Sequence, residues 1–404
     1  MMDSGLRHYF IVTGSYWAFT LTDGAIRMLV VLYFHLLGYS PLEVAMLFLF
    51  YEFFGIVTNL LGGWLGTRIG LNMTMHIGMA LQILALTMLM VPDSWLSVSY
   101  VMFAQALSGI AKDLNKMSAK ASIKTLLPAQ NSDSKLFKWI ALLTGSKNAL
   151  KGLGFFLGAL LLQQLEFRGA LAALSSTLFI VLVFSVLLLP AGLGKLKKKT
   201  KFSQIFFNSP EINRLSLARF FLFGARDVWF VVALPLYLYT VLDWRFSEVG
   251  AYLALWIIGY GIVQASAPRL LRKTHHGLGP NGKTAQFWAF ILIPIPTFIA
   301  LALHYDFFTQ SSLLIGLIIF GGVFAINSAV HSYLIVAWSD SDKVSMNVGF
   351  YYMANAAGRL TGTVLSGWIY QDYGLIACLI CASGFIFITT ILSLGLPNTR
   401  QLKN

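Results

Sequence analysis

The stretch GALAALSSTLFIVLVFSVLLLPAGLGKLKKKTK (residues 169–201) decides the fold class, because an apolar run passes directly into a cluster of lysines. Residues 169–190 carry no charged side chain, and about 20 such residues are enough to cross the ~30 Å hydrocarbon core of a bilayer. The segment 191–211 is the longest polar break in the chain. This pattern indicates a membrane-spanning helix followed by a basic loop at the membrane surface.

The same pattern extends along the whole chain. Of its 404 residues, 57% are hydrophobic and only 11% are charged, whereas ordinary soluble domains contain about 25% charged residues. Apolar runs of spanning length recur from end to end, which predicts an all-α membrane protein that retains its first helix. We predict twelve spans, at residues 9–37, 42–66, 72–91, 95–119, 137–164, 169–190, 212–241, 247–270, 284–304, 311–338, 345–370 and 374–396.

Lysine and arginine are distributed unevenly between the two sides of the membrane. With both termini in the cytoplasm, 19 of the 29 Lys and Arg lie in or beside cytoplasmic segments, two lie outside and eight lie within spans. This bias satisfies the positive-inside rule, so the net charge of +13 mostly reflects topology and does not call for nucleic acid. We assign Lys120 and Lys124 to the cytoplasmic end of their span, and 191–211 to a cytoplasmic linker that attracts anionic membrane lipid.

A faint internal repeat divides the chain. Asn148 and Gln164 in the first half recur as Asn355 and Gln371 at the same spacing in the second half. Two parallel six-helix repeats joined by a basic loop resemble the major facilitator architecture. We therefore predict that fold, with two pseudo-symmetric bundles of six helices. The predicted domains are 1–190, the linker 191–211, and 212–404.

Charged residues within the spans point to a binding site, because burying a charge at bilayer depth costs at least ~2.5–3.5 kcal/mol. Eight cations lie within spans, namely Arg27, Lys112, Lys116, Lys147, Lys151, Arg219, Arg226 and Arg359. Only four anions do so, namely Asp23, Glu52, Asp113 and Asp227. Lys116 and Arg219 are long enough to snorkel to the cytoplasmic face, yet the remaining charges still carry a surplus of two cations. Arg226 and Asp227 are adjacent and should point about 100° apart, so we expect them to satisfy one another poorly.

In the major facilitator architecture, the helices that carry these cations line a central cavity. Excess arginine and lysine there select an anion of two or more charges. The predicted substrate-binding residues are Arg27, Lys112, Lys147, Lys151, Arg226, Arg359, Asn148, Asn355 and His331, with Asn327 as a further neutral donor. Proton coupling or charge pairing is expected of Asp23, Glu52, Asp113 and Asp227. Three alternatives stay open: Asp23 and Arg27 form only a neutral pair, Glu52 is a silent carboxyl, and His331 is a satisfied core histidine.

Other motifs are better explained by packing. Cys378 and Cys381 form a CxxC without a nearby third ligand, so we expect no metal, no disulfide framework and no cofactor. The GxxxG pairs Gly154/Gly158 and Gly358/Gly362 suggest close helix packing. The chain contains neither a phosphate-binding GxxxxGK[ST] loop nor a nucleophile–base set, which argues against an ATP-driven pump and against an enzyme.

Several stretches carry a resemblance to known families. GGWLGTRIGL (62–71) is similar to the major facilitator loop signature, and the matching Arg68 and Gly70 are expected to have a gating role. Thr67 departs from the signature, because it stands where the acid of the gating contact is usually found. Longer stretches resemble the ArsJ-type organoarsenical efflux permeases: YWAFTLTDGAIRMLVVLYFHLLGYSPLE, LFLFYEFFGIVTNLLGGWLG, SGIAKDLNKMSAKASIK, LLTGSKNALKG and ARFFLFGARDVWFVVALPLYL.

The ArsJ resemblance implies proton-coupled export of 1-arseno-3-phosphoglycerate by alternating access, and hence arsenate resistance. It also implies glyceraldehyde-3-phosphate dehydrogenase, which makes this ester from arsenate, as a functional partner, and a bacterial inner membrane location with both termini cytoplasmic. The chain is expected to be a monomer. The same cations would serve a general organophosphate/phosphate or organic-anion antiporter, which is the alternative, and a transporter-like membrane sensor is a remote one.

Overall fold

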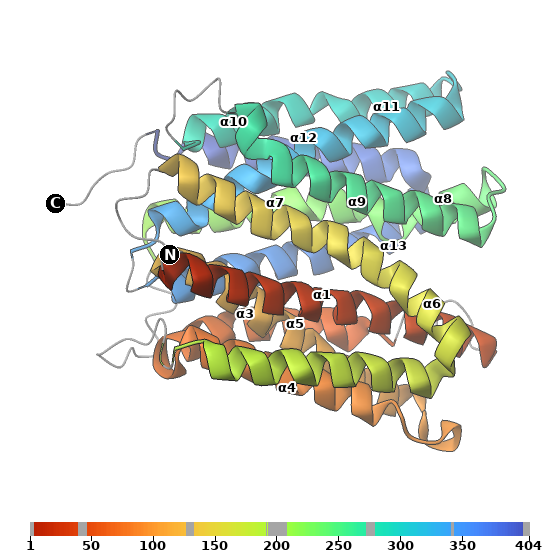
Figure 1. Cartoon of the computed structure of the whole chain (residues 1–404). Coiled ribbons are helices and arrows are strands. Elements are labelled where there is room, and N and C mark those ends of the chain that lie inside the picture. The colour runs from red at the N-terminus through yellow and green to blue at the C-terminus, as the bar shows by residue number, and fades with distance from the viewer. Residues whose placement is uncertain are drawn as a thin grey trace. The chain divides into compact units, whose positions relative to one another are not determined.

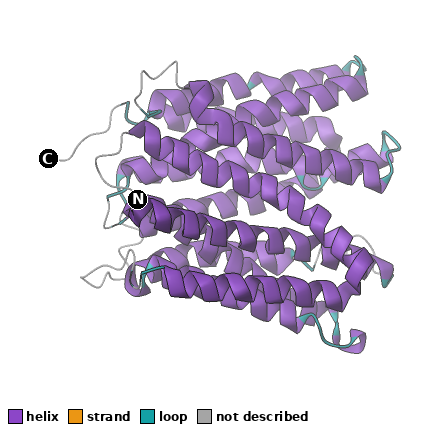
Figure 2. Cartoon of the chain, viewed as in Figure 1, coloured by secondary structure: helices purple, strands orange, loops and turns teal. Residues whose placement is uncertain are grey.

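A computed structural model describes residues 4–38, 47–126, 133–190, 192, 208–271, 279–340 and 343–398. Within these residues the chain forms helices joined by short turns, and no strand occurs among them (Figure 2). The predicted all-α class is therefore confirmed. The predicted linker 191–211 lies largely outside the described residues, of which it contains only Gly192 and 208–211.

The helices follow the predicted spans closely. The first half of the chain contains α1 (Ser4–Leu36), α3 (Leu49–Ile69), α4 (Leu71–Met88), the 3-10 turn η1 (Asp93–Trp95), α5 (Val98–Leu126) and α6 (Asp133–Leu188). The second half contains α7 (Pro210–Phe230), α8 (Ala233–Thr240), α9 (Phe246–Leu271), α10 (Gly282–Leu292), α11 (Pro294–His304), α12 (Thr309–Trp338) and α13 (Val344–Leu394).

Two of these helices are interrupted at the predicted span boundaries. In α6 the backbone leaves helical geometry at Glu166, with φ 57° and ψ 179°. In α13 it does so at Gly374, with φ 73° and ψ −175°. Positive φ is readily accessible to glycine and unfavourable for a residue with a Cβ atom. Each long helix is thus two successive spans joined by a single-residue break.

Eight helical stretches in the described part of the chain are long and apolar enough to cross a membrane. One of them, Val344–Leu394, contains the break at Gly374 and so comprises two spans. Polar and charged side chains lower the apolarity of α3, α5 and the first part of α6, which fall outside these stretches. These less apolar helices are also the ones that carry many of the predicted site residues.

The chain divides into two compact units, each described by itself below. The first unit comprises Met1–Asn131, Ser146–Phe207 and Asp340–Met353, and the second comprises Ser132–Gly145, Asn208–Ser339 and Ala354–Asn404. In the first unit, α5 packs beside α1, α3 and α4, while in the second unit α12 packs beside α7, α9, α10 and α11 (Figure 1). The units follow the sequence halves except for the beginnings of α6 and α13, which each belong to the other half's unit.

Glycines allow equivalent close helix contacts in both units. A Cβ atom on Gly154 would lie 2.7 Å from the carbonyl oxygen of Leu21, so α6 approaches the backbone of α1. A Cβ atom on Gly358 would lie 2.1 Å from the carbonyl oxygen of Phe220, so α13 approaches α7 in the same way. The prediction that the two GxxxG pairs serve helix packing is confirmed.

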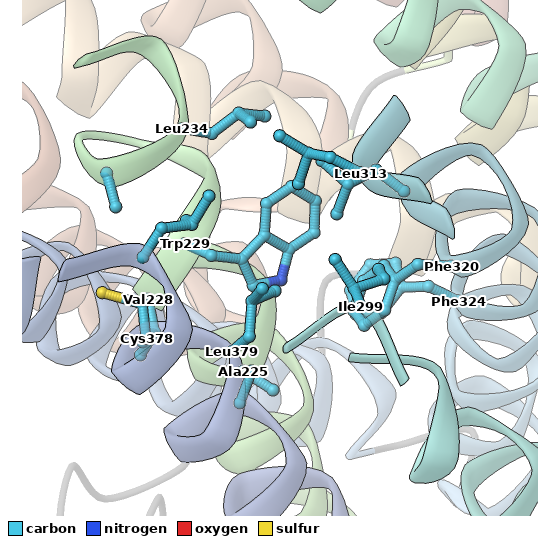
Figure 3. Close-up of a cluster of buried hydrophobic side chains, with 14 of the residues drawn as sticks. Ala225, Val228, Trp229, Leu234, Ile299, Leu313, Phe320, Phe324, Cys378 and Leu379 are labelled. Atoms are coloured by element: carbon cyan, nitrogen blue, oxygen red, sulfur yellow. The ribbon is translucent and has the colours of Figure 1, made fainter. Parts of the chain in front are cut away.

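A buried cluster of aliphatic and aromatic side chains forms the core of the second unit (Figure 3). Trp229 lies edge-on to Phe320, with ring centroids 5.1 Å apart, and is fully buried among side chains of α7, α11, α12 and α13. Cys378 belongs to this cluster and is also fully buried. Its thiol is therefore surrounded by apolar side chains, as expected for packing rather than chemistry.

Candidate functional site

In the first unit, Glu52 connects three helices. Its Oε1 lies 3.2 Å from Nη2 of Arg27 on α1, and its Oε2 lies 3.7 Å from Nζ of Lys112 on α5. The side chain of Glu52 is 27% exposed, so this cluster is neither fully buried nor on the surface. Each carboxylate oxygen faces one cation, an arrangement that neutralises part of the positive charge on the helices around it.

Lys112 also reaches a second carboxylate. Its Nζ lies 3.9 Å from Oδ2 of Asp113, whose side chain is only 2% exposed. Asp113 in turn forms an ion pair with Lys116 one turn further along α5. Lys116 therefore pairs within the protein rather than simply snorkelling to the membrane surface, and Lys112 is shared between two acids.

A third carboxylate, Asp23 on α1, lies 3.7 Å from Nζ of Lys151 on α6. Tyr51 donates a hydrogen bond from its hydroxyl to Oδ1 of Asp23 at 2.5 Å. The Tyr51 ring has Lys112 Nζ at 3.7 Å and Arg27 Cζ at 4.5 Å from its centroid. Both cations gain a cation–π contact there, so Tyr51 joins the Asp23 pair to the Glu52 cluster.

The cytoplasmic end predicted for α5 is buried in the first unit. Lys120 is 2% exposed and donates a hydrogen bond from Nζ to the Tyr352 hydroxyl at 2.7 Å. Lys116 lies over the same tyrosine ring, with its Nζ 4.4 Å from the centroid. The interpretation of Lys120 as one more charge at the membrane surface therefore overlooked its buried partner, and the side chain of Lys124 lies outside the described residues.

The remaining predicted ligands of the first unit lie on α6. Lys147 and Asn148 are half-buried, at the turn of α6 just before Lys151. Lys151 pairs with a carboxylate of α1 rather than with an acid of its own helix. The structure thus brings Arg27, Lys112, Lys151, Asp23, Glu52 and Asp113 together, and places Lys147 and Asn148 next to them along the chain.

In the second unit, a single buried acid holds two arginines. Asp227 is fully buried, with Oδ1 2.5 Å from Nη2 of Arg226 and Oδ2 3.0 Å from Nε of Arg359. The prediction that adjacent Arg226 and Asp227 satisfy one another poorly is wrong. The arginine side chain is long enough to fold back onto the neighbouring carboxylate although the two Cβ atoms point apart.

Arg219 was expected to be able to snorkel to the membrane surface, and this is wrong as well. It is 2% exposed and donates from Nε to Oδ1 of Asn355 at 2.9 Å. Its Nη1 donates to the carbonyl and hydroxyl oxygens of Ser328 at 3.3 and 3.1 Å. Its guanidinium also lies 3.8 Å from the centroid of the Phe223 ring. Arg219 is therefore an interior residue of the second unit.

His331 and Asn327 lie one turn apart on α12 and are completely buried. Neither the ring nitrogens of His331 nor the side-chain amide of Asn327 has a hydrogen-bond partner among the described residues. Of the open alternative for His331, the core location is confirmed, and no hydrogen bond to a described residue satisfies its ring.

Among the described residues, the buried and half-buried charge clusters of both units hold more cations than carboxylates. In the first unit five cations, Arg27, Lys112, Lys116, Lys120 and Lys151, accompany three carboxylates, which leaves a surplus of two. In the second unit Arg219, Arg226 and Arg359 accompany Asp227, which leaves the same surplus. Such clusters attract anions, and the carboxylates can exchange with an anion for the same cations.

Sequence reasoning missed two tyrosines and the position of one arginine. Tyr51 and Tyr352 were not selected because aromatic residues are common in membrane spans and carry no charge. Tyr51 is nevertheless next to Glu52 in the chain, a signal that would have placed it near the charges. Arg219 was noticed as a charge in a span, but its burial depends on its contacts with α12 and α13.

The expected gating loop lies between α3 and α4. Gly70 has φ 97° and ends α3 by donating its N–H to the carbonyl of Gly66. A positive φ of this size favours glycine, which explains the residue type there. Arg68 is exposed, with its guanidinium 4.3 Å from the centroid of the Trp64 ring.

No group of three or more His, Cys, Asp or Glu side chains that could hold a metal ion occurs among the described residues. Cys378 is enclosed by the apolar core shown in Figure 3, and Cys381 is half-buried beside it. The chemistry available in the described residues is therefore that of fixed cations, carboxylates and hydrogen-bond donors.

Comparison with known proteins places this arrangement in a family. The family model described as Major Facilitator Superfamily matches residues 12–330. No curated protein matches the sequence significantly. Solved structures match over nearly the whole chain, at identities that show the fold alone.

Three of these structures illustrate the likeness. The human organic anion transporter MFSD10 (TETRAN) is 15% identical, with a TM-score of 0.76, and 97% of this chain and 100% of that chain are covered. A bacterial homologue of the iron transporter ferroportin, in its outward-facing state, is 16% identical with a TM-score of 0.75 and covers 96% of this chain and 98% of its own. The E. coli fucose:proton symporter FucP is 11% identical with a TM-score of 0.72, covering 97% and 99%. The chain therefore belongs to the major facilitator superfamily and is a multi-pass secondary transporter of that family, not an enzyme.

Proposed function

We propose that this transporter exports the doubly acidic ester 1-arseno-3-phosphoglycerate from the bacterial cytoplasm, across the inner membrane, and so confers resistance to arsenate. The observation that carries the proposal is the surplus of two cations over carboxylates in the buried and half-buried charge clusters of each unit, counted among the described residues. An ester with a phosphate group at one end and an arsenate group at the other supplies the negative charge that such clusters bind. The exported ester would hydrolyse to arsenate outside the cell.

The resemblance to the ArsJ-type permeases supports this choice because it coincides with the charged clusters. The resembling stretches include Asp23 and Arg27, Glu52, and the Lys112–Asp113–Lys116 segment of α5. They also include Lys151 and the Arg226–Asp227 pair, whose side chains face charged partners in their own units. The likeness is thus strongest where the structure concentrates its buried charges.

The carboxylates provide a route to proton coupling. Protonation of Glu52 would weaken its hold on Arg27 and Lys112, and protonation of Asp23 would release Lys151. Substrate and carboxylates would thus exchange at the same cations, and protonation of the carboxylates would change how readily they do so. This exchange would link the proton gradient to alternating access of the site. Both termini are assigned to the cytoplasm, and the protein is taken to act as a monomer.

The decisive experiment uses everted membrane vesicles that contain the full-length protein. Glyceraldehyde-3-phosphate dehydrogenase, glyceraldehyde 3-phosphate, NAD and arsenate generate the ester outside the vesicles, and arsenic uptake is measured. We expect uptake that depends on the dehydrogenase and on a proton gradient, and that falls at least about tenfold when Lys151 is replaced by Glu. Retained uptake in Lys151→Glu would contradict the binding role, and uptake without the dehydrogenase would contradict the substrate.

A general organophosphate/phosphate or organic-anion antiporter is the second candidate. The described cations recognise phosphate and arsenate groups alike, and the structurally similar MFSD10 is an organic anion transporter by name. Equal uptake of 3-phosphoglycerate or inorganic phosphate in the same vesicles would favour this candidate. Absence of any coupled solute movement would favour a membrane sensor.

A further inference from the structure

A polar cluster in the second unit lies apart from the Asp227 ion pairs. Asn327, His331 and Ser332 are fully buried on α12, and the amide of Asn327, both ring nitrogens of His331 and the hydroxyl of Ser332 have no hydrogen-bond partner among the described residues. Leaving buried donors and acceptors unsatisfied costs free energy. Residues 327 and 331 share one helix face, so their polar groups are available to the same ligand.

Arg219 brings positive charge close to this cluster, because its guanidinium interacts electrostatically with the His331 ring. It donates to both oxygens of Ser328, which stands next to Asn327 in the chain, and to Oδ1 of Asn355 on α13. Gln264 on α9 donates to the same Ser328 hydroxyl at 3.1 Å. Four helices, α7, α9, α12 and α13, thus converge here, and polar side chains from all of them are fixed by hydrogen bonds around Ser328.

The spacing along α7 relates this cluster to the Asp227 ion pairs. Arg219 and Arg226 are seven residues apart, two helical turns or about 10 Å along the axis, and so lie on the same face. Both contact the Phe223 ring between them, with guanidinium carbons 3.8 and 4.9 Å from its centroid. The second unit therefore carries two guanidinium groups in line, separated by one aromatic ring.

We infer that Arg219, Asn327, His331, Ser332 and Asn355 form a second oxyanion subsite, which binds one acidic group of the substrate while Arg226 and Arg359 bind the other. A guanidinium offers paired N–H donors that match the oxygens of a phosphate, arsenate or carboxylate group. The amide of Asn327, the imidazole of His331 and the hydroxyl of Ser332 supply neutral donors beside it. Only the identity of the occupant, a small ester with an acidic group at each end, rests on the proposed function.

Ligand truncation separates this role from a structural one. The ratio of dissociation constants is measured for glycerol 3-phosphate, which has one acidic group, and 3-phosphoglycerate, which has two, with the purified full-length protein in detergent. We expect the wild type to prefer 3-phosphoglycerate by about tenfold or more, equivalent to ~1.4 kcal/mol per factor of ten. We expect the ratio to approach one in Arg219→Lys and in His331→Gln.

One control and a second test variant make the result decisive. Arg214→Lys changes an exposed arginine on the same helix, which donates to the carbonyl of Gly395 at 2.8 Å, and should leave the ratio unchanged. If Arg219 had a purely structural role, Arg219→Lys would weaken the binding of both ligands equally and leave the ratio of dissociation constants unaltered. That result would overturn the subsite. His331→Gln provides the same test if Arg219→Lys does not fold.

The outcome is independent of the test of the proposed function. Export of the arsenate ester by wild-type vesicles together with an unchanged ratio in both variants would overturn the subsite and leave the proposed function standing. A collapsed ratio without export of the ester would establish the subsite and overturn the proposed function. A wild-type ratio near one would also overturn the subsite.

Discussion

Tyr51, on α3, connects charged side chains from α1 and α5 of the first unit. Its hydroxyl donates to Asp23, while its ring faces Lys112 and Arg27. A phenylalanine would keep both cation–π contacts and remove only the hydrogen bond, whose acceptor is a charged group. Hydrogen bonds to charged groups contribute about 1.5–3 kcal/mol. The hydroxyl thus connects the Asp23–Lys151 pair with the Glu52 cluster.

We predict that Tyr51→Phe lowers the rate of proton-driven uptake several-fold while the protein folds normally. Without the tyrosine hydroxyl, Asp23 would lose the hydrogen bond that holds its carboxylate in position to compete with substrate for Lys151. Vesicle uptake and thermal unfolding in detergent measure the two effects. Tyr100→Phe is the matched control, since its hydroxyl donates to the carbonyl of Met88 away from the charges. Equal rates in the two variants would show that the Tyr51 hydroxyl has no part in transport.

The carboxylate of Asp227 compensates the positive charge of two arginines in the second unit. Its fully buried carboxylate faces Arg226 and Arg359, and removing one partner of a buried ion pair leaves a charge uncompensated. We predict that Asp227→Asn destabilises the protein by about 3–5 kcal/mol, measured by denaturation in detergent. Additional replacement of Arg359 by Gln should restore part of the loss, because it removes one of the stranded cations.

The control for this prediction is an exposed ion pair. Asp93 and Arg168 lie 3.2 Å apart with both side chains more than half exposed, and such pairs contribute about 0–1 kcal/mol. Asp93→Asn should therefore change stability little. A loss in Asp227→Asn no larger than that in Asp93→Asn would show that the buried carboxylate does not compensate the arginines.

At the scale of whole helices, close backbone contacts set the distance between α7 and α13. Gly358 and Gly362 face the backbone of α7, and a Cβ atom on Gly362 would lie 2.6 Å from the carbonyl oxygen of Gly224. The same contact positions Arg359, which lies between these glycines in the chain, against Asp227 on α7. Helix packing and the ion pair are therefore two consequences of one interface.

We predict that Gly358→Val lowers both stability and transport. A Cβ atom there would lie 2.1 Å from the carbonyl oxygen of Phe220, so α13 must move away from α7 and carry Arg359 with it. Overpacking of this kind typically costs about 1–3 kcal/mol. Unfolding temperature and vesicle uptake are the measurements.

Gly367 on the same helix provides the comparison. A Cβ atom at Gly367 meets nothing within 4 Å, and replacing a helical glycine by alanine gains about 0.5–1 kcal/mol. Gly367→Ala should therefore be tolerated or mildly stabilising. If Gly358→Val were as stable and active as this variant, the close contact would not constrain the helices.

At the scale of the molecule, the topology predicts on which side of the membrane each end of a helix lies. Arg68 lies in the last turn of α3, and Asp93 lies a few residues after the end of α4. The 18 residues of α4 span about 27 Å, close to the thickness of the hydrocarbon core. Both side chains are exposed, so they should lie in water on opposite sides of the membrane.

We predict that, in a background with Cys378 and Cys381 replaced by Ser, Asp93→Cys reacts with a membrane-impermeant thiol reagent added to intact spheroplasts. Arg68→Cys should react only after permeabilisation, because the positive-inside rule assigns this arginine to the cytoplasm. Arg168→Cys should behave as Asp93→Cys does, since the two native side chains form an ion pair. Labelling of Arg68→Cys in intact spheroplasts would show that the topology is the reverse of the one predicted.

The sequence by itself determined the helical spans, their boundaries near Glu166 and Gly374, and which of the spans carry charged residues. Hydropathy and span length depend only on consecutive residues, so they can be predicted from the sequence of each segment alone. Only the tertiary structure decided that Arg226 folds back onto Asp227, that Lys151 meets Asp23, that Tyr51 joins two ion-pair groups and that Arg219 is buried. These pairings depend on the rotation of each helix about its axis and on side-chain reach across close helix contacts, and neither is encoded in the spacing of residues along the chain.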